Sequence, residues 1–446
     1  MKHKRCCLQK YVISTLSGLM LYIFSYNQTL AQSNSPILTI DAALERGQDV
    51  SKHISAAKIQ SNIAGTKADD AKNLRIPDIE AHTGYARLTD LIQYDRGLKD
   101  PETFQSIYDK VDFTMKAGVP VYAGGKISHI IKKTKQELEL AQLNTNKTAR
   151  NVRLEIKGLY LTIFKMMEMQ RLIRENIKEE EARLKEVQAL KKNGVVTRNE
   201  ILRAELQLSE QQLNLTAATN NVAIAKHQLQ VLLELEDDFN IDTNQLIHEP
   251  FATTSFEANL HMALQMQDDL KMQAQEVKIK ETDKRIAKAA YYPTVGLFGS
   301  YGLNYPNYFF FPPANNWYRL GMAGVDISFN ISNLYKNRKK VSIAEQAINL
   351  QEVEMDAVKE AVENRVHQAS VKYNEYIQRI DITRLAIAQA AENYRIVKNK
   401  YLNQLALITE MIDADNSLLE AKFNASAARI DTQIKFYELQ YAIGVL

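Results

Sequence analysis

The chain has very little cysteine. Its 446 residues contain two cysteines, Cys6 and Cys7, and both precede an apolar stretch from Tyr11 to Phe24. Basic residues before this stretch and small residues after it predict a secretory signal peptide over residues 1–31. An uncleaved anchor is the less favoured alternative, because the stretch is shorter than the roughly 20 residues of a spanning helix. The mature protein would then be exported without cysteine, which excludes disulfides, metal–thiolate sites and cysteine nucleophiles.

An excess of charge of one sign is also lacking. The chain has 56 basic and 53 acidic residues, and four of the basic residues lie in the predicted signal. Without them 52 basic residues face 53 acidic ones, so net charge gives no support for nucleic-acid binding. No apolar run after residue 31 approaches the ~18 residues of a membrane helix. If the mature chain enters a membrane, we expect it to do so as strands.

Features of enzymes are scarce as well. No phosphate-binding glycine loop, nucleophile elbow or cofactor fingerprint is present, and we expect neither catalysis nor a cofactor. None of the histidines after the signal has a second histidine or an acidic cluster at metal-ligand spacing. His82 is expected to line a lumen. With only 16 glycines and 9 prolines, the chain is predicted to form long uninterrupted elements.

What the sequence does contain is a large internal duplication. Lys126 to Gly194 and Lys336 to Gln404 bound helical stretches of equal length, related by a shift of 210 residues. Nearer the start of each copy, Pro77 corresponds to Pro293 at a shift of 216. The sequence therefore predicts two structural repeats, one over residues 32–250 and one over residues 251–446.

Each repeat is predicted to be mostly helical. Val152, Leu159, Met166 and Ile173 keep a heptad step, which indicates a coiled-coil seam. Long helical hairpins are expected over about 126–236 and 334–443, with first helices on the order of 100 Å long. A shorter helix is expected to open each repeat, from Thr39 to about Leu74 and from Glu257 to about Ala290.

Between the short and long helices the period changes to two. Alternation of polar and apolar residues predicts β-hairpins over about 78–122 and 294–332. Four strands are too few to close a barrel with a lumen, since about eight fill even a small one. We therefore expect each chain to supply a fraction of a membrane-spanning barrel that identical chains complete. The loop in the second hairpin is rich in aromatic residues, which predicts an interfacial belt; a self-packed apolar loop is the alternative. These residues are Tyr305, Tyr308, Phe309, Phe310, Phe311 and Trp317.

Local phrases at the ends of the elements carry a family resemblance. A strand-to-helix junction is formed by Pro120, the pair Gly124 and Gly125, and Lys126. The first helical tip contains Asn193-Gly194-Val195-Val196-Thr197, and Thr409 to Ala414 repeats its pattern in the second copy. With these phrases in a duplicated chain, the sequence resembles the TolC-like outer membrane efflux proteins over its whole mature length.

This resemblance implies a fold, a location and partners. The fold class is mixed α and β: a homotrimer in which twelve strands form one outer-membrane β-barrel and twelve helices form a periplasmic coiled-coil tunnel. The implied function is a passive exit duct of a tripartite efflux or type I secretion system. The implied partners are outer-membrane lipid, a periplasmic adaptor (membrane fusion protein) and an inner-membrane pump. A periplasmic coiled-coil scaffold or adaptor without membrane insertion remains the rival interpretation.

The two tips are predicted to differ in detail. Gly194 can take the left-handed conformation that ends a helix, and Thr197 with Glu200 has the spacing of a capping box. In the second copy Gln404 replaces the glycine, and we expect the left-handed position to shift to Asn403. By the resemblance, the tip residues contact the adaptor. They are Asn193, Gly194, Thr197, Asn403 and Gln404.

An acidic pair follows the second tip. Glu410 and Asp413 are three residues apart on one helical face. They match the positions where the family carries the acidic ring that narrows the periplasmic entrance, which would favour cations. Ordinary solvated charges near a helix start are the alternative. Asp415 fits this pattern less well, and we expect it to pair with a neighbouring helix.

Overall fold

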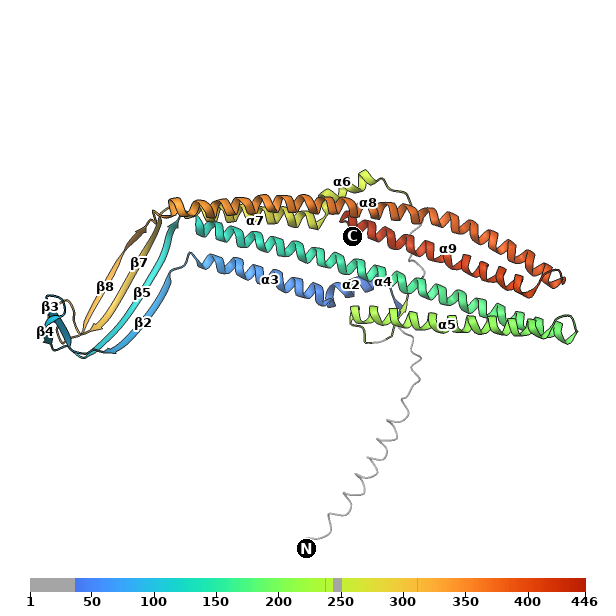
Figure 1. Cartoon of the computed structure of the whole chain (residues 1–446), viewed down its shortest axis with the longest axis horizontal. Helices are drawn as coiled ribbons and strands as arrows, with labels where there is room; N and C mark the ends of the chain where they lie inside the picture. The colour runs from blue at the N-terminus through green and yellow to red at the C-terminus, as the bar shows by residue number, and fades with distance from the viewer. Residues whose placement is uncertain (1–36, 237, 244–250, 311) are drawn as a thin grey trace, which may run out of the picture.

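The computed structural model describes residues 37–236, 238–243, 251–310 and 312–446. The predicted signal peptide and Phe311 lie outside these ranges. The molecule is elongated, with a β-sheet at one end and long helices running away from it (Figure 1). The sheet has the strand order β2-β5-β7-β8, and every neighbouring pair is antiparallel. Its strands are β2 (Asp78–Arg87), β5 (Asp109–Ala123), β7 (Thr294–Tyr305) and β8 (Tyr318–Ser328).

The two copies meet at the centre of this sheet. Strand β5 from the first hairpin pairs with β7 from the second, which leaves β2 and β8 as the edges. A smaller hairpin of β3 (Leu91–Asp95) and β4 (Lys99–Phe104) lies beyond the far end of β2 and β5. The alternation pattern did not predict this extra hairpin.

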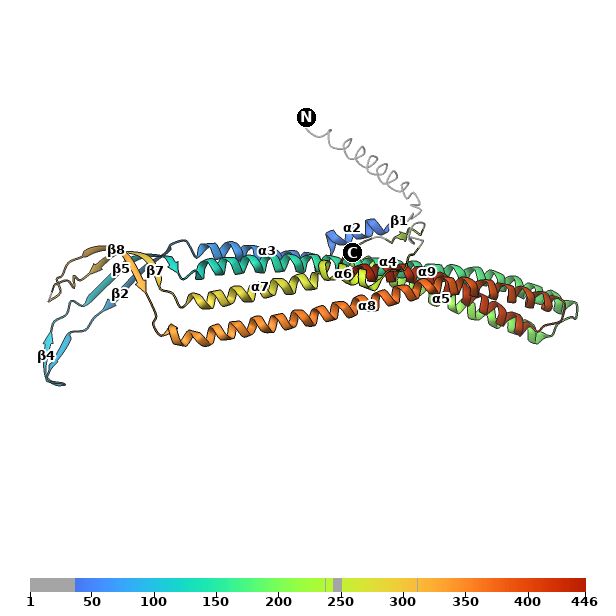
Figure 2. The same ribbon diagram turned by 90° about the horizontal axis from the view of Figure 1, so that it is seen from above.

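Two long helical hairpins form the rest of the molecule. The first is α4 (Lys126–Lys192) with α5 (Arg198–Leu233), and the second is α8 (Asn333–Leu402) with α9 (Ile408–Ile443). Near the sheet the helices form one layer in the order α3-α4-α7-α8, which Figure 2 shows from above. Toward the tips the order becomes α5-α4-α9-α8. None of the helices in the described part of the chain combines the length and the apolar character needed to cross a bilayer.

The short helices are not continuous, contrary to the sequence prediction. The first is divided into α2 (Ile40–Val50) and α3 (Lys52–Asn73), and the second into α6 (Phe256–Met266) and α7 (Asp268–Ala289). The breaks fall at Ser51 and Gln267, which correspond at the shift of 216. The Ser51 hydroxyl accepts a hydrogen bond from the Ile54 amide, so it caps the new helix. The side-chain amide of Gln267 donates to the backbone carbonyls of Tyr441 and Ala442 at 2.9 and 2.7 Å.

The main core lies at these breaks, midway along the helices. It joins α2, α4, α5 and α9 to a two-stranded parallel sheet of β1 (Ile37–Leu38) and β6 (Asn240–Ile241). Tyr160 is fully buried there, and its hydroxyl donates to the Leu38 carbonyl at 2.6 Å. The core therefore fixes the first repeat against α9 of the second.

Candidate functional site

The two faces of the four-stranded sheet differ in polarity. One face carries Glu80, His82, Asp112 and Lys116, and His82 lies 3.6 Å from the Asp112 carboxylate. The other face carries mainly apolar side chains. Residues on this apolar face include Ile79, Val111, Phe113, Leu297, Leu303, Val325 and Ile327. A sheet of this kind fits a wall between lipid and a polar lumen.

The aromatic residues of the second hairpin divide between the two faces. Tyr305 and Trp317 stack with ring centroids 5.3 Å apart, and strand alternation places them with the apolar side chains. Phe309 instead contacts Tyr318 edge to face. Tyr308 and Tyr318 line the same hollow as His82, on the polar face. Tyr308, Phe309 and Phe310 are exposed, and their role in a belt stays a prediction.

Both glycines of the strand-to-helix junction have a left-handed backbone. Gly124 and Gly125 have φ of +60° and +81°, and Gly125 is the N-cap of α4. A Cβ atom at Gly124 would lie 2.5 Å from the Ala289 carbonyl oxygen, so only glycine fits this approach of α7. Pro120 lies beside a register shift between β5 and β7, where the strand bends.

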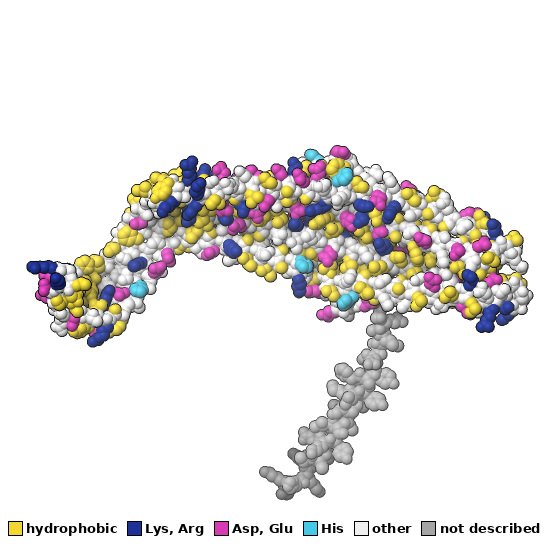
Figure 3. All heavy atoms as spheres, in the orientation of Figure 1, with side chains coloured by type: hydrophobic (Ala, Val, Ile, Leu, Met, Phe, Trp, Pro, Cys, Tyr) yellow, Lys and Arg dark blue, Asp and Glu magenta, His cyan; other side chains and the backbone are white. Residues whose placement is uncertain are grey.

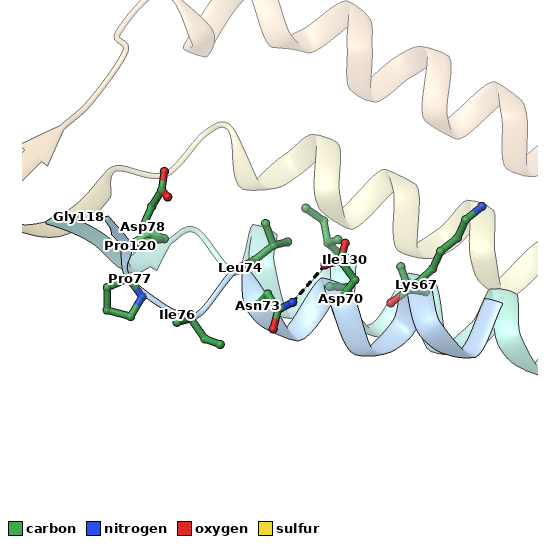
Figure 4. A pocket seen from close by; sticks show the side chains of 12 residues that line it. Lys67, Asp70, Asn73, Leu74, Ile76, Pro77, Asp78, Gly118, Pro120 and Ile130 are labelled. Atoms are coloured by element: carbon green, nitrogen blue, oxygen red, sulfur yellow. Dashed lines mark hydrogen bonds between the residues drawn. The ribbon is translucent and has the colours of Figure 1, made fainter. Parts of the chain in front are cut away.

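A hollow of about 790 Å³ opens beside this junction. Its wall is formed by the end of α3, the start of β2 and the start of α4 (Figure 4). Leu74, Ile76 and Pro77 give it an apolar floor, and Asp70 and Asp78 add carboxylates. Because α3 and β2 are edge elements of the chain, the hollow lies at the border of the protomer.

The two tips are built alike. Gly194 and Gln404 are both left-handed, with φ of +74° and +61°. The amides of Val195 and Leu405 donate to the Leu190 and Lys400 carbonyls at 3.0 and 2.8 Å, which is the Schellman pattern at both tips.

The expected shift of the left-handed position to Asn403 is therefore wrong, because the hydrogen-bond pattern fixes that position at residue 404. Asn403 has φ of −93°. The predicted capping box is also absent: Thr197 is the N-cap of α5, but its side chain makes no capping hydrogen bond. Glu200 instead accepts a hydrogen bond from the Tyr401 hydroxyl at 3.3 Å. This contact joins the first hairpin to the second.

Glu410 and Asp413 lie in the first two turns of α9, and both are exposed. Within the described ranges neither carboxylate has an ion-pair partner. Met411 and Ala414, between and beside them, are buried. The acidic pair therefore lies on the free face of the helix, where it is open to solvent or to a neighbouring chain.

A buried charged cluster near the tips was not predicted. Arg183 on α4 donates to Glu180 at 2.6 Å and to Asp415 on α9 at 2.8 Å, and all three side chains are at most 2% exposed. Tyr394 on α8 accepts from Arg183 at 3.2 Å. Burial raises the pKa of Glu180 to about 7, against the opposing effect of Arg183. The expectation that Asp415 pairs with a neighbouring helix is confirmed. Glu180 and Arg183 gave no sequence signal, because i,i+3 charge pairs usually lie on solvated faces.

The model of the outer membrane efflux protein family matches residues 40–234 and 259–445, one segment in each repeat. The chain belongs to the outer membrane efflux protein family. It is accordingly an efflux duct of the outer membrane, with its helical part in the periplasm as a tunnel. No curated protein sequence matches the chain.

Solved structures of outer membrane channels have the same fold as this efflux protein. The outer membrane protein VceC from Vibrio cholerae is 16% identical, with a TM-score of 0.72 over 91% of this chain and 96% of VceC. The open state of the MtrE channel from Neisseria gonorrhoeae is 15% identical, with a TM-score of 0.73 over 91% and 89%. CusC is 13% identical, with a TM-score of 0.74 over 94% and 95%. MtrE is an outer membrane channel and CusC forms a transmembrane channel. The mixed helix-and-strand fold expected from the sequence is confirmed.

Proposed function

We propose that three copies of this efflux protein close into one duct, with twelve strands in the barrel and twelve helices in the tunnel. The observation that carries the proposal is the pair of open edges. Strands β2 and β8 each have one side without a partner strand in the described chain. Their antiparallel order lets β8 of one chain pair with β2 of the next. Ring closure removes both edges, which would otherwise be sites of aggregation.

The helical edges support the same closure. On α5, exposed Leu206 and Leu213 are one heptad apart, and on α8 so are Ile343 and Leu350. These helices border the two edges of the helical layer. Packed side by side, α8 of one chain and the α3 and α5 helices of the next would bury the stripes as coiled-coil seams.

The hollow at the junction supports the closure as well. Figure 3 shows Lys and Arg side chains gathered over the first turns of α8. They are Lys336, Arg338, Lys339 and Lys340, all exposed. In a closed ring this stretch of α8 would lie beside the hollow of the next chain, whose lining has two carboxylates, Asp70 and Asp78, against one cation, Lys67. Opposite charges at this border favour the head-to-tail arrangement over other contacts.

The partners follow from the family and from the tips. The duct would receive its substrate from an inner-membrane pump through a periplasmic adaptor. The adaptor would contact the tips at Asn193, Gly194, Thr197, Asn403 and Gln404. Both tips end in Schellman turns with exposed side chains, so six similar turns would surround the entrance of the trimer.

The acidic pair would narrow that entrance. Three copies of Glu410 and Asp413 bring six carboxylates to one ring, which attracts cations and repels anions. The test is the reversal potential of single channels in planar bilayers under a salt gradient. The Glu410→Ala/Asp413→Ala variant is expected to lose most of its cation preference, and Glu420→Ala, an exposed acid further along α9, is the control. Unchanged selectivity in the double variant would contradict the ring.

A further inference from the structure

An arginine, Arg319, lies on the apolar face of the sheet. Arg319 of β8 pairs across the strands with Leu303 of β7, one pleat from the stacked Tyr305 and Trp317. Its side chain is exposed. No hydrogen bond or ion pair joins it to any other described residue. A charged side chain on the lipid face of a barrel is destabilising near the bilayer midplane, so its place calls for a physical reason.

The depth of Arg319 in the membrane gives part of that reason. Leu303 lies eight positions after Val295, the first apolar residue of β7. At roughly 3.3 Å per residue and a strand tilt of about 40°, the two residues differ in height by roughly 20 Å along the barrel axis, whereas the apolar band of a barrel is about 25 Å tall. The helices leave the opposite end of the sheet (Figure 1). Arg319 therefore lies near the headgroups of the outer leaflet, level with the aromatic pair.

The described strands offer Arg319 no free carboxylate on this face. Strand alternation places one acid there, Asp109 of β5. That carboxylate already accepts from the Tyr85 hydroxyl at 2.8 Å and from Arg87 at 3.4 Å. Arg87 therefore lies on the same face as Arg319 but, unlike Arg319, has a carboxylate partner within its own chain.

Strand β2 of a neighbouring chain does not supply one either. In the proposed ring, on which this step rests, Arg319 on the β8 edge faces β2 of the next copy. The apolar face of β2 carries Ile79, Ala81, Thr83, Tyr85 and Arg87. None of these is acidic, so no register of the two edges can pair Arg319 with a carboxylate of β2.

We propose that Arg319, Trp317 and Tyr305 form a binding site for the phosphate of a lipid in the outer leaflet. The planar guanidinium can donate two parallel hydrogen bonds to the oxygens of one phosphate, and this geometry makes arginine suited to the anion. The indole and phenol rings lie at the headgroup level and bracket the sugar or glycerol beside the phosphate. Three such sites would surround the outer rim of the trimer.

The only tryptophan in the chain is Trp317, so its fluorescence reports from the site itself. Trp317 emission of the full-length trimer in neutral detergent is measured against added phosphatidic acid, against diacylglycerol and against inorganic phosphate. Phosphatidic acid is expected to change the emission with saturation, whereas the other two leave it unchanged. The Arg319→Gln variant should need at least tenfold more phosphatidic acid for half-saturation. Arg319→Lys should show a smaller loss, and Arg87→Gln should stay within twofold.

Three outcomes would overturn the site. These are equal binding by the parent protein and Arg319→Gln, an equal loss in Arg87→Gln, and the same response to diacylglycerol or to inorganic phosphate alone. A heat-modifiable oligomer band on gels shows whether each variant still assembles. Loss of that band in the parent protein would count against the proposed trimer, whereas an intact trimer without a lipid response counts against the site alone.

Discussion

Arg183 of α4 and Asp415 of α9 form an ion pair of 2.8 Å with both side chains 2% exposed. The pair joins the first helical hairpin to the second close to the tips, with Glu180 on the same guanidinium. One Glu180 oxygen and the Arg183 Nε have no hydrogen-bond partner among the described residues. An ion pair therefore joins the two hairpins in a buried environment, where an unpaired charge would lower the stability of the fold.

Removal of the cation should open this junction. The Arg183→Met variant leaves Glu180 and Asp415 buried without a cation, with only the Asn176 amide still donating to Asp415, and loss of one partner of a buried pair typically costs about 3–5 kcal/mol. Hydrogen exchange of the tip amides measures the free energy of local opening. The control is Arg384→Met, because Arg384 is 74% exposed in an i,i+3 pair with Asp381 and should change stability by no more than about 0.5 kcal/mol. Equal protection of the tips in both variants would contradict the structural role of the cluster.

The same cluster predicts a pH dependence. The pKa of Glu180 is raised from 4.5 to about 7 because burial disfavours its ionised form. Between these two pH values Glu180 is protonated in the folded tip but ionised in the unfolded chain. Its contribution to the stability of the tip is therefore fully present below about pH 4.5 and is lost as pH rises to about 7. Tip amides should exchange faster at pH 8 than at pH 5 after correction for intrinsic rates.

Glu180→Gln should remove most of this difference, since glutamine cannot ionise. Its neighbour Glu179 is exposed, and Glu179→Gln should keep the parental pH profile. Tip amides that are better protected from hydrogen exchange at pH 8 than at pH 5 would show that the predicted direction of the pH dependence is wrong.

The two left-handed tip positions make a matched pair. Gly194→Ala adds a Cβ with nothing within 4 Å, so its cost comes from the backbone alone. We expect about 1–2 kcal/mol of lost local stability at the first tip. Gln404→Gly relieves the same strain and should stabilise the second tip by about 1 kcal/mol. Protease cleavage rates at each tip measure both effects, and changes of the same sign in the two variants would contradict the Schellman geometry.

The junction glycine is predicted to be sensitive to a single methyl group. Gly124→Ala would bring Cβ within 2.5 Å of the Ala289 carbonyl, in a backbone conformation that alanine rarely adopts. Assembled trimer in outer-membrane fractions should fall severalfold. Gly118→Ala in β5 is the control, because the nearest atom to its Cβ is a carbonyl oxygen at 4.0 Å. Normal assembly of Gly124→Ala would show that α7 and β5 can separate without consequence.

The sequence predicted the features that depend on periodicity. Heptad seams and strand alternation repeat over many residues, so the long hairpins and the sheet were visible in one sequence. The features that depend on single tertiary contacts were missed. Nothing local marks Gln267 as a helix break, since its side-chain amide is held by carbonyls of α9. The left-handed Gln404 was missed for a similar reason, because asparagine is the better left-handed residue when judged alone.

The candidate site divides in the same way. Helical spacing placed Glu410 and Asp413 on one face of their helix, and the family resemblance pointed to the glycines of the junction. The pairing of Asp415 with a neighbouring helix was expected, but its partners Arg183 and Glu180 could not be predicted, because α4 and α9 meet only in the folded chain.

The central claim is that β8 of one chain pairs with β2 of the next. The only cysteines, Cys6 and Cys7, lie in the predicted signal, so introduced cysteines would be the only thiols of the mature chain. The most direct measurement is disulfide formation in intact outer membranes between Thr83→Cys on β2 and a cysteine on β8, placed in turn at Gly321, Ala323 and Val325. Within one chain these strands lie roughly 14 Å apart across two others, beyond the ~7 Å that a disulfide allows. We predict that oxidation yields a covalent trimer at one of the three registers, and monomers at all three would contradict the account.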